Sequence, residues 1–82
     1  MAKKKTIIPV SLPALMARIN RKLGHDGEQL KATRSERARL ELGDYYIIDT
    51  DRNVILHKDC ELVELARELG VLKPYEALER ES

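Results

Sequence analysis

The sequence predicts an α+β fold: a small antiparallel sheet of about three strands packed by an N-terminal and a C-terminal helix, in the order α-β-β-β-α. Apolar residues recur every three or four positions near both ends of the chain, as in amphipathic helices. Between these segments apolar and polar residues alternate, as in half-buried strands. With 82 residues and a hydrophobic fraction of 43%, the chain is expected to form a single domain, residues 1–82, around one small core.

The first helix is predicted over residues 12–23. Ser11 is a favourable N-cap, and Pro13 falls in the first turn, where its missing N–H costs nothing. Gly24 is expected to end the helix. The predicted apolar stripe consists of Leu12, Leu15, Met16, Ile19 and Leu23.

Residues 1–10 precede this helix and are expected to be a basic tail or, through "TIIPV", an edge strand. Pro9 lacks a backbone N–H, which confines such a strand to the edge of a sheet. The globular part is therefore expected to span residues 11–80.

Three strands are predicted in the middle of the chain. "EQLKATR" places Leu30 and Ala32 at a period of two, and "LELGDYYIID" and "NVILHK" follow as a pair. Gly43 inside the second segment indicates a bulge or a kink. In "SERAR", between the first two strands, Ser35 could cap a single helical turn.

The second helix is predicted over residues 60–69, with Asp59 as its N-cap. Gly70 followed by an apolar residue is typical of a left-handed C-cap. A last short helical turn is expected from Lys73-Pro74. The apolar stripe of the helix would be Leu62, Leu65, Ala66 and Leu69, and Tyr75 and Leu78 would pack from the last turn.

Asp49, Asp51 and Asn53 stand at alternate positions, as ligands do at the start of a calcium-binding loop. Such a loop requires Gly at its sixth position and a bidentate Glu at its twelfth. The sequence has Val54 and Cys60 there. Asp and Asn also tolerate positive φ and bond their own backbone, so this segment is predicted to be a hairpin turn without a metal.

No catalytic, metal-binding or cofactor-binding pattern emerges. A zinc site needs four ligands at fixed spacing, which a chain with one cysteine does not supply. A Cys60–His57 nucleophile pair lacks an orienting third group, and no glycine-rich phosphate loop is present. The expectation is a non-enzymatic protein without a cofactor or small-molecule substrate. The lone cysteine and the absence of a long apolar run favour the cytoplasm and no membrane association.

The net charge of +1 hides an uneven distribution. Residues 1–39 carry ten Lys or Arg against three Asp or Glu, a net of +7, and residues 40–82 carry five against eleven, a net of −6. Such asymmetry indicates a surface for a polyanion in the basic half. The same charge distribution is equally well explained if the two halves face each other or if both are exposed to solvent.

Nucleic acid is the first candidate partner, because clusters of Lys and Arg neutralise phosphates without reading bases. Tyr45 and Tyr46 could stack bases, but neighbouring strand residues point to opposite faces, so at most one joins a given surface. The candidate residues are a tail of Lys3, Lys4 and Lys5, a helical patch of Arg18, Arg21 and Lys22, and a third group of Lys31, Arg34, Arg37 and Arg39.

A protein partner is the alternative, with the chain acting as an adaptor or inhibitor. Glu61, Glu64 and Glu68 share one face of the second helix, and a basic partner, including a second copy of this chain, would relieve their repulsion. "ELARELGVLKPYEAL" has the outline of a helix-turn-helix, but Pro74 interrupts the would-be recognition helix. That segment is therefore expected to pack rather than to read DNA.

"TIIPVSLPALMARINRKL", "LGDYYIIDTDRNVIL" and "LVELARELGVLKPYEAL" together resemble a group of short, uncharacterised proteobacterial proteins associated with plasmids and integrated mobile elements. The resemblance covers most of the chain. It implies a bacterial cytoplasmic protein with an accessory or regulatory role, and it assigns no functional residue.

Overall fold

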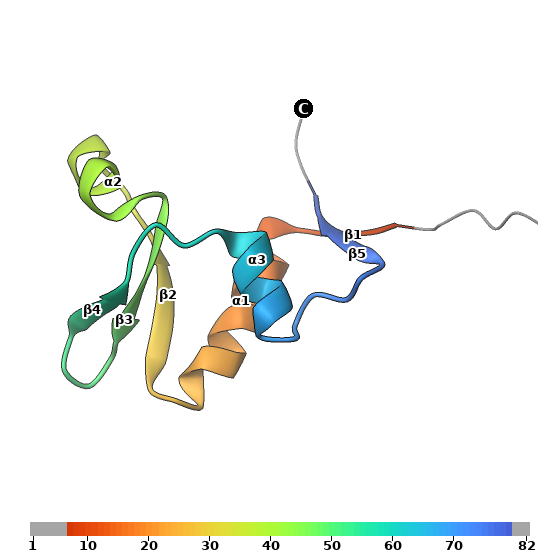
Figure 1. The fold of residues 1–82 in the computed structure, drawn as a ribbon, viewed down its shortest axis with the longest axis horizontal. Coiled ribbons are helices and arrows are strands. Elements are labelled where there is room, and N and C mark those ends of the chain that lie inside the picture. Colours follow the sequence, from red (N-terminus) through yellow and green to blue (C-terminus); the bar gives the residue numbers. More distant parts are fainter. Residues whose placement is uncertain (1–6, 80–82) are drawn as a thin grey trace, which may run out of the picture.

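The computed structural model describes residues 7–79 (Figure 1). Their elements, in order, are β1 (Ile8–Val10), α1 (Leu12–Gly24), β2 (Glu28–Ala32), α2 (Glu36–Leu42), β3 (Tyr45–Asp49), β4 (Val54–His57), α3 (Leu62–Glu68) and β5 (Glu76–Leu78). The antiparallel sheet has the order β2-β3-β4, and β1 pairs separately with β5. The predicted α+β class and the three-stranded antiparallel sheet are confirmed. The predicted order α-β-β-β-α is wrong, because it lacks β1, α2 and β5.

α1 begins and ends close to its predicted bounds. The Ser11 hydroxyl accepts a hydrogen bond from the Ala14 N–H at 3.3 Å, which confirms the N-cap. Leu15, Ile19 and Leu23 are buried at the centre of the molecule, as their helical spacing predicts.

The three-stranded sheet has the predicted pairing. Leu30 of β2 lies opposite Ile47 of β3, and both are buried. The predicted turn between β3 and β4 is also confirmed. The Asp49 carboxylate accepts hydrogen bonds from the N–H groups of Asp51 (2.8 Å) and Arg52 (3.1 Å), and Asn53 adopts a positive φ of 57°.

α2 replaces the first half of a predicted strand. The strand predicted over "LELGDYYIID" begins later than expected, because residues 40–42 form the last turn of α2. Ser35 caps this helix through the Ala38 N–H, and Gly43 ends it instead of forming a bulge. Strong helix formers and a cap therefore prevail over a two-residue alternation. Leu40 is left 88% exposed.

α3 is shorter than the predicted helix 60–69. Its N-cap is Glu61, not Asp59, which has a positive φ of 55°. Leu62 and Ala66 are buried as predicted, whereas Leu65 is only half-buried. The predicted left-handed end is confirmed at Gly70, with φ of 76°. The N–H groups after the helix bond back to carbonyls of its last turn, Val71 to Ala66 at 2.9 Å and Gly70 to Arg67 at 3.1 Å.

The segment expected to form a last helical turn is β5 instead. It pairs in parallel with β1, so that Ile8 lies opposite Glu76 and Val10 opposite Leu78. The sequence Glu-Ala-Leu favours a helix locally, and pairing with a distant strand overrides that preference. β1 confirms the edge strand expected within "TIIPV" for residues 8–10, while Lys3, Lys4 and Lys5 lie outside the described residues.

α1 lies between the two sheets and supplies the centre of the core (Figure 1). None of the helices within residues 7–79 is long and apolar enough to cross a bilayer. The buried apolar residues are Val10, Leu15, Ile19, Leu23, Leu30, Ile47, Leu62, Ala66 and Leu72.

Candidate nucleic-acid interface

A basic groove lies between the second half of α1 and the segment that follows α3. Its volume is about 440 Å³. α1 contributes cations from successive turns, and the segment 70–76 contributes another cation and an exposed aromatic ring. We call these residues the basic groove: Arg18, Arg21, Lys22, His25, Lys73, Tyr75 and Glu76, with Gly70 and Val71 completing its wall.

Arg18 and Glu76 form an ion pair inside the groove. The Arg18 guanidinium donates to a Glu76 carboxylate oxygen at 2.9 Å and to the Val71 carbonyl at 3.1 Å. The same Glu76 oxygen accepts the Lys73 N–H at 2.9 Å. The hydrogen bonds from Arg18 and from the Lys73 backbone hold the pKa of Glu76 below its ordinary value. Arg18 is thereby part of the internal structure and is not a free solvent-facing cation.

The segment 71–76 is held in place by a second arginine. The Arg67 guanidinium donates to the carbonyls of Lys73 at 3.2 Å and Glu76 at 3.3 Å. The left-handed turn at Gly70 directs the chain back toward α1 immediately before this segment. The positions of Lys73 and Tyr75 are therefore fixed by contacts on both sides.

The free charge of the groove is positive. It contains four Lys or Arg side chains and one carboxylate, a net of +3 with the histidine neutral. Glu76 is paired with Arg18, and among residues 7–79 no carboxylate forms an ion pair with Arg21, Lys22 or Lys73, so these three residues carry the positive charge of the groove. Tyr75 is 50% exposed beside them, so its ring is accessible to a flat ligand group.

The third predicted basic group is not part of this groove. Lys31 and Arg34 line a separate depression of about 610 Å³ between β2 and α2. Arg39 forms an exposed ion pair with Asp44, at 3.1 Å. Arg37 is an exposed residue of α2. Within residues 7–79 the predicted cations thus fall into separate groups: Arg18, Arg21 and Lys22 line the groove, and the third basic group does not.

The two adjacent tyrosines point to opposite sides of the sheet, as predicted. Tyr45 packs against the core, and Tyr46 lies opposite Lys31 on the other face, beside the second depression. Neither tyrosine lines the basic groove.

On the acidic face of α3, Glu61 is used within the molecule, and Glu64 and Glu68 are exposed. The Glu61 carboxylate caps the helix by accepting the N–H of Glu64 at 3.0 Å. Glu64 and Glu68 line a shallow depression that also includes Lys58 and His57 from the end of β4. A basic residue of the chain therefore already lies in the same depression as these carboxylates.

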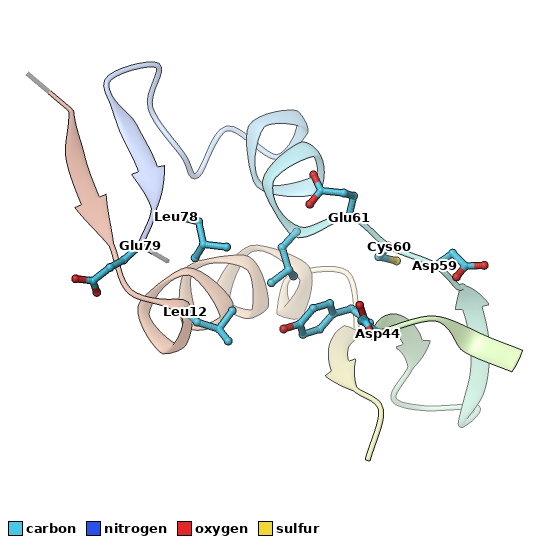
Figure 2. A pocket seen from close by; sticks show the side chains of 9 residues that line it. Leu12, Asp44, Asp59, Cys60, Glu61, Leu78 and Glu79 are labelled. Atoms are coloured by element: carbon cyan, nitrogen blue, oxygen red, sulfur yellow. The ribbon is translucent and has the colours of Figure 1, made fainter. Parts of the chain in front are cut away.

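A fourth hollow, of about 370 Å³, has acidic and apolar walls (Figure 2). Leu12 and Leu78 lie on one side of it, and the side chains of Asp59 and Glu79 point away from its centre. Within residues 7–79, no three His, Cys, Asp or Glu side chains are grouped so as to hold a metal ion. Burial and the neighbouring Asp59 raise the pKa of the Cys60 thiol, which disfavours the reactive thiolate.

Comparison with protein-family models, with curated proteins and with solved structures finds no match to this chain. The resemblance to short proteins of mobile elements stays a prediction. Sequence reasoning identified the α1 contribution to the groove but missed Lys73, His25 and Tyr75. His25 follows the cations of α1 by less than one helical turn, a spacing that would have placed it nearby. No local signal brings Lys73 and Tyr75 to α1.

Proposed function

We propose that this chain is a non-enzymatic, cytoplasmic accessory protein that binds the backbone of single-stranded nucleic acid in the basic groove. The observation that carries the proposal is the exposed side chain of Tyr75 in the same groove as the cations Arg21, Lys22 and Lys73. Basic grooves that contain an exposed aromatic residue bind single strands by neutralising phosphates and stacking on a base.

The choice of a single strand follows from Tyr75. A ring that is half exposed can stack on an unpaired base, and such stacking contributes about 1–3 kcal/mol per base. In a duplex the bases are stacked on each other and do not reach the ring. No recognition helix was identified, so the binding is proposed to be indifferent to base sequence.

The alternative is an adaptor or inhibitor that binds a protein through Glu61, Glu64 and Glu68. Its support is smaller, because Glu61 caps α3 and the other two share a depression with Lys58. A protein partner becomes the better proposal if no nucleic acid binds the groove.

The test is a fluorescence anisotropy titration of a labelled, mixed-sequence single strand of about 12 nucleotides at several salt concentrations. With three cations in contact with phosphates, the logarithm of the affinity should fall against the logarithm of salt with a slope of about 2. Arg21→Gln/Lys22→Gln should reduce this slope by about 1.4, since each contact contributes about 0.7 for single strands.

A matched variant removes the same charge elsewhere. Arg34→Gln/Arg37→Gln should leave the slope nearly unchanged, because neither residue lines the groove. Equal losses from the two double variants would show that binding follows overall charge, and the groove would be the wrong site.

Tyr75 separates stacking from charge. Tyr75→Leu should weaken single-strand binding roughly fivefold to hundredfold without changing the salt slope, and Tyr75→Phe should bind normally. The backbone of Tyr75 keeps its bond to the Ile8 N–H in both variants. If Tyr75→Leu binds like the parent, or duplex binds as tightly as single strand, the stacking role is wrong.

A further inference from the structure

His25 is an exposed titratable side chain of the basic groove. It follows the last residue of α1 and keeps helical backbone angles, φ −64° and ψ −24°. Its backbone N–H donates to the Lys22 carbonyl at 3.3 Å, which holds the residue at the end of the helix. Among residues 7–79 no ion pair involves its imidazole ring. The ring is therefore accessible to a ligand that enters the groove.

Cations line the groove from both of its walls together with His25. Arg21 and Lys22 precede His25 by four and three positions, so all three side chains lie on one face at the end of α1. Lys73 contributes from the segment that follows α3. A strand whose phosphates contact these cations therefore brings negative charge to the wall that carries His25.

We propose that His25, when it is protonated, becomes a fourth phosphate-binding cation of the groove, so that single-strand binding strengthens as the pH falls. The inference rests on the proposed function and adds a regulation of the same site. Histidine is the side chain whose charge ordinarily changes between pH 5 and 8. A positive imidazole beside four Lys or Arg and one carboxylate raises the net charge of the groove from +3 to +4.

The proton and the strand each favour the binding of the other. A phosphate beside the imidazole stabilises the charged form of the ring, because opposite charges attract. By thermodynamic reciprocity, the charged ring then raises the affinity for the phosphate by the same factor. A neutral ring still has one N–H donor, but it adds no charge to the contact. Binding is therefore expected to take up protons, and the strand should bind more tightly at about pH 6 than at about pH 8.

The other charged groups of the groove keep their charge over this range. Hydrogen bonds from Arg18 and the Lys73 N–H hold the pKa of Glu76 below its ordinary value, so this carboxylate stays ionised. Lys, Arg and Tyr side chains do not ordinarily change charge between about pH 6 and 8. Asp26, the residue after His25, does not line the groove. A pH response of the groove is therefore assigned to His25.

The second histidine of the chain lies in a different environment. His57 lines the shallow depression that also contains Glu64 and Glu68 of α3, and it is not part of the basic groove. A phosphate in the groove therefore does not contact His57. Since the chain has two histidines, one inside the groove and one outside it, each serves as the control for the other.

The test measures the affinity of a labelled, mixed-sequence single strand of about 12 nucleotides, without a terminal phosphate, at about pH 8 and about pH 6. The affinity of the parent should rise roughly twofold to fivefold toward the lower pH, as one added exposed ion pair allows. The slope of log affinity against log salt should also become steeper by up to about 0.7, the contribution of one phosphate contact on a single strand.

Three variants assign the response to one ring. His25→Gln should lose the gain in affinity and the change in salt slope, because glutamine has no proton to gain in this range. His25→Lys carries a permanent charge, so at about pH 8 it should bind as tightly as the parent binds at about pH 6. His57→Gln is the matched control and should keep the full response of the parent.

Circular dichroism at both pH values must show the same fold for the parent and the three variants. Equal affinity of the parent at the two pH values, a response that persists in His25→Gln, or a response that is lost in His57→Gln would overturn this inference and leave the proposed function standing. A strand that binds at neither pH would overturn the proposed function and this inference with it.

Discussion

Three apolar side chains of α1, Leu15, Ile19 and Leu23, are buried, whereas the β3–β4 hairpin and α2 leave similar side chains in solvent. Leu15 and Ile19 have no exposed surface, while Leu40 is 88% exposed. Arg18 and Glu76 form an ion pair in the first region. The difference indicates that the core of the domain is built around α1, and that the hairpin and α2 contribute fewer buried side chains to it.

The largest expected effect comes from replacing one leucine in each region by alanine. Leu15→Ala should lower the free energy of unfolding by about 2–5 kcal/mol, because it leaves a cavity in the core. Leu40→Ala should change it by less than about 0.5 kcal/mol. A domain of this length has a total stability on the order of 4–12 kcal/mol, so Leu15→Ala approaches complete unfolding. Urea denaturation measures both. Equal effects would contradict the comparison.

A smaller effect is expected from two glycines. Gly43 joins α2 to β3 with φ 79° and ψ −169°, a conformation almost confined to glycine, and an added Cβ would lie 2.8 Å from the Asp59 Cα. Gly43→Ala should therefore destabilise the fold by about 1–3 kcal/mol. Gly24→Ala, at the end of α1 with no atom in the way, should be neutral or stabilise by about 0.5–1 kcal/mol.

Together, Gly43→Ala and Gly24→Ala test whether the connection between α2 and β3 is held in a fixed conformation. Thermal melts of both proteins under the same conditions provide the measurement. If Gly43→Ala melts at the parental temperature, α2 and β3 are not joined by a fixed connection.

The smallest expected effect is a change in the pH dependence of stability at Glu76. Hydrogen bonds from Arg18 and the Lys73 N–H lower the pKa of Glu76 in the folded protein. The carboxylate therefore stabilises the fold above its unfolded pKa of about 4.3 and ceases to do so as the pH falls through the lowered folded value. Glu76→Gln should lower the melting temperature by a few degrees at neutral pH and converge with the parent in acid.

Glu41→Gln, in exposed α2, is the matched control for this pH dependence. It removes an exposed carboxylate from α2. The difference in melting temperature between this variant and the parent should stay constant from neutral pH to acid. Parallel curves for Glu76→Gln as well would mean that the ion pair with Arg18 contributes nothing to stability.

The parts of the fold that could be predicted are those with local causes. Helical spacing and a serine cap locate α1, and the Asp49 side chain with Asn53 locates the hairpin turn. Gly70 correctly marks the end of α3. In each case the residues that determine the structure lie within one turn of the chain.

β5 and the site have non-local causes. Glu-Ala-Leu becomes a strand only because β1 lies beside it, 68 positions earlier in the chain from Glu76 to Ile8. Arg18 forms an ion pair with Glu76, which lies 58 positions away in the sequence. Periodicity and propensity describe neighbours in sequence, so they identified Arg21 and Lys22 as exposed cations but not their proximity to Tyr75.

The pairing of β1 with β5 also has a consequence for biosynthesis. On the ribosome β1 emerges first, whereas its one strand partner among the described residues is the last element to be made. Until β5 has been made, Ile8–Val10 has no strand beside it, and Val10, which is buried in the folded protein, is accessible to chaperones and proteases. Parallel pairing over such a separation closes a long loop, a step that disfavours rapid folding. A chain that stops before Lys73 would lack β5, and β1 would then have no strand partner.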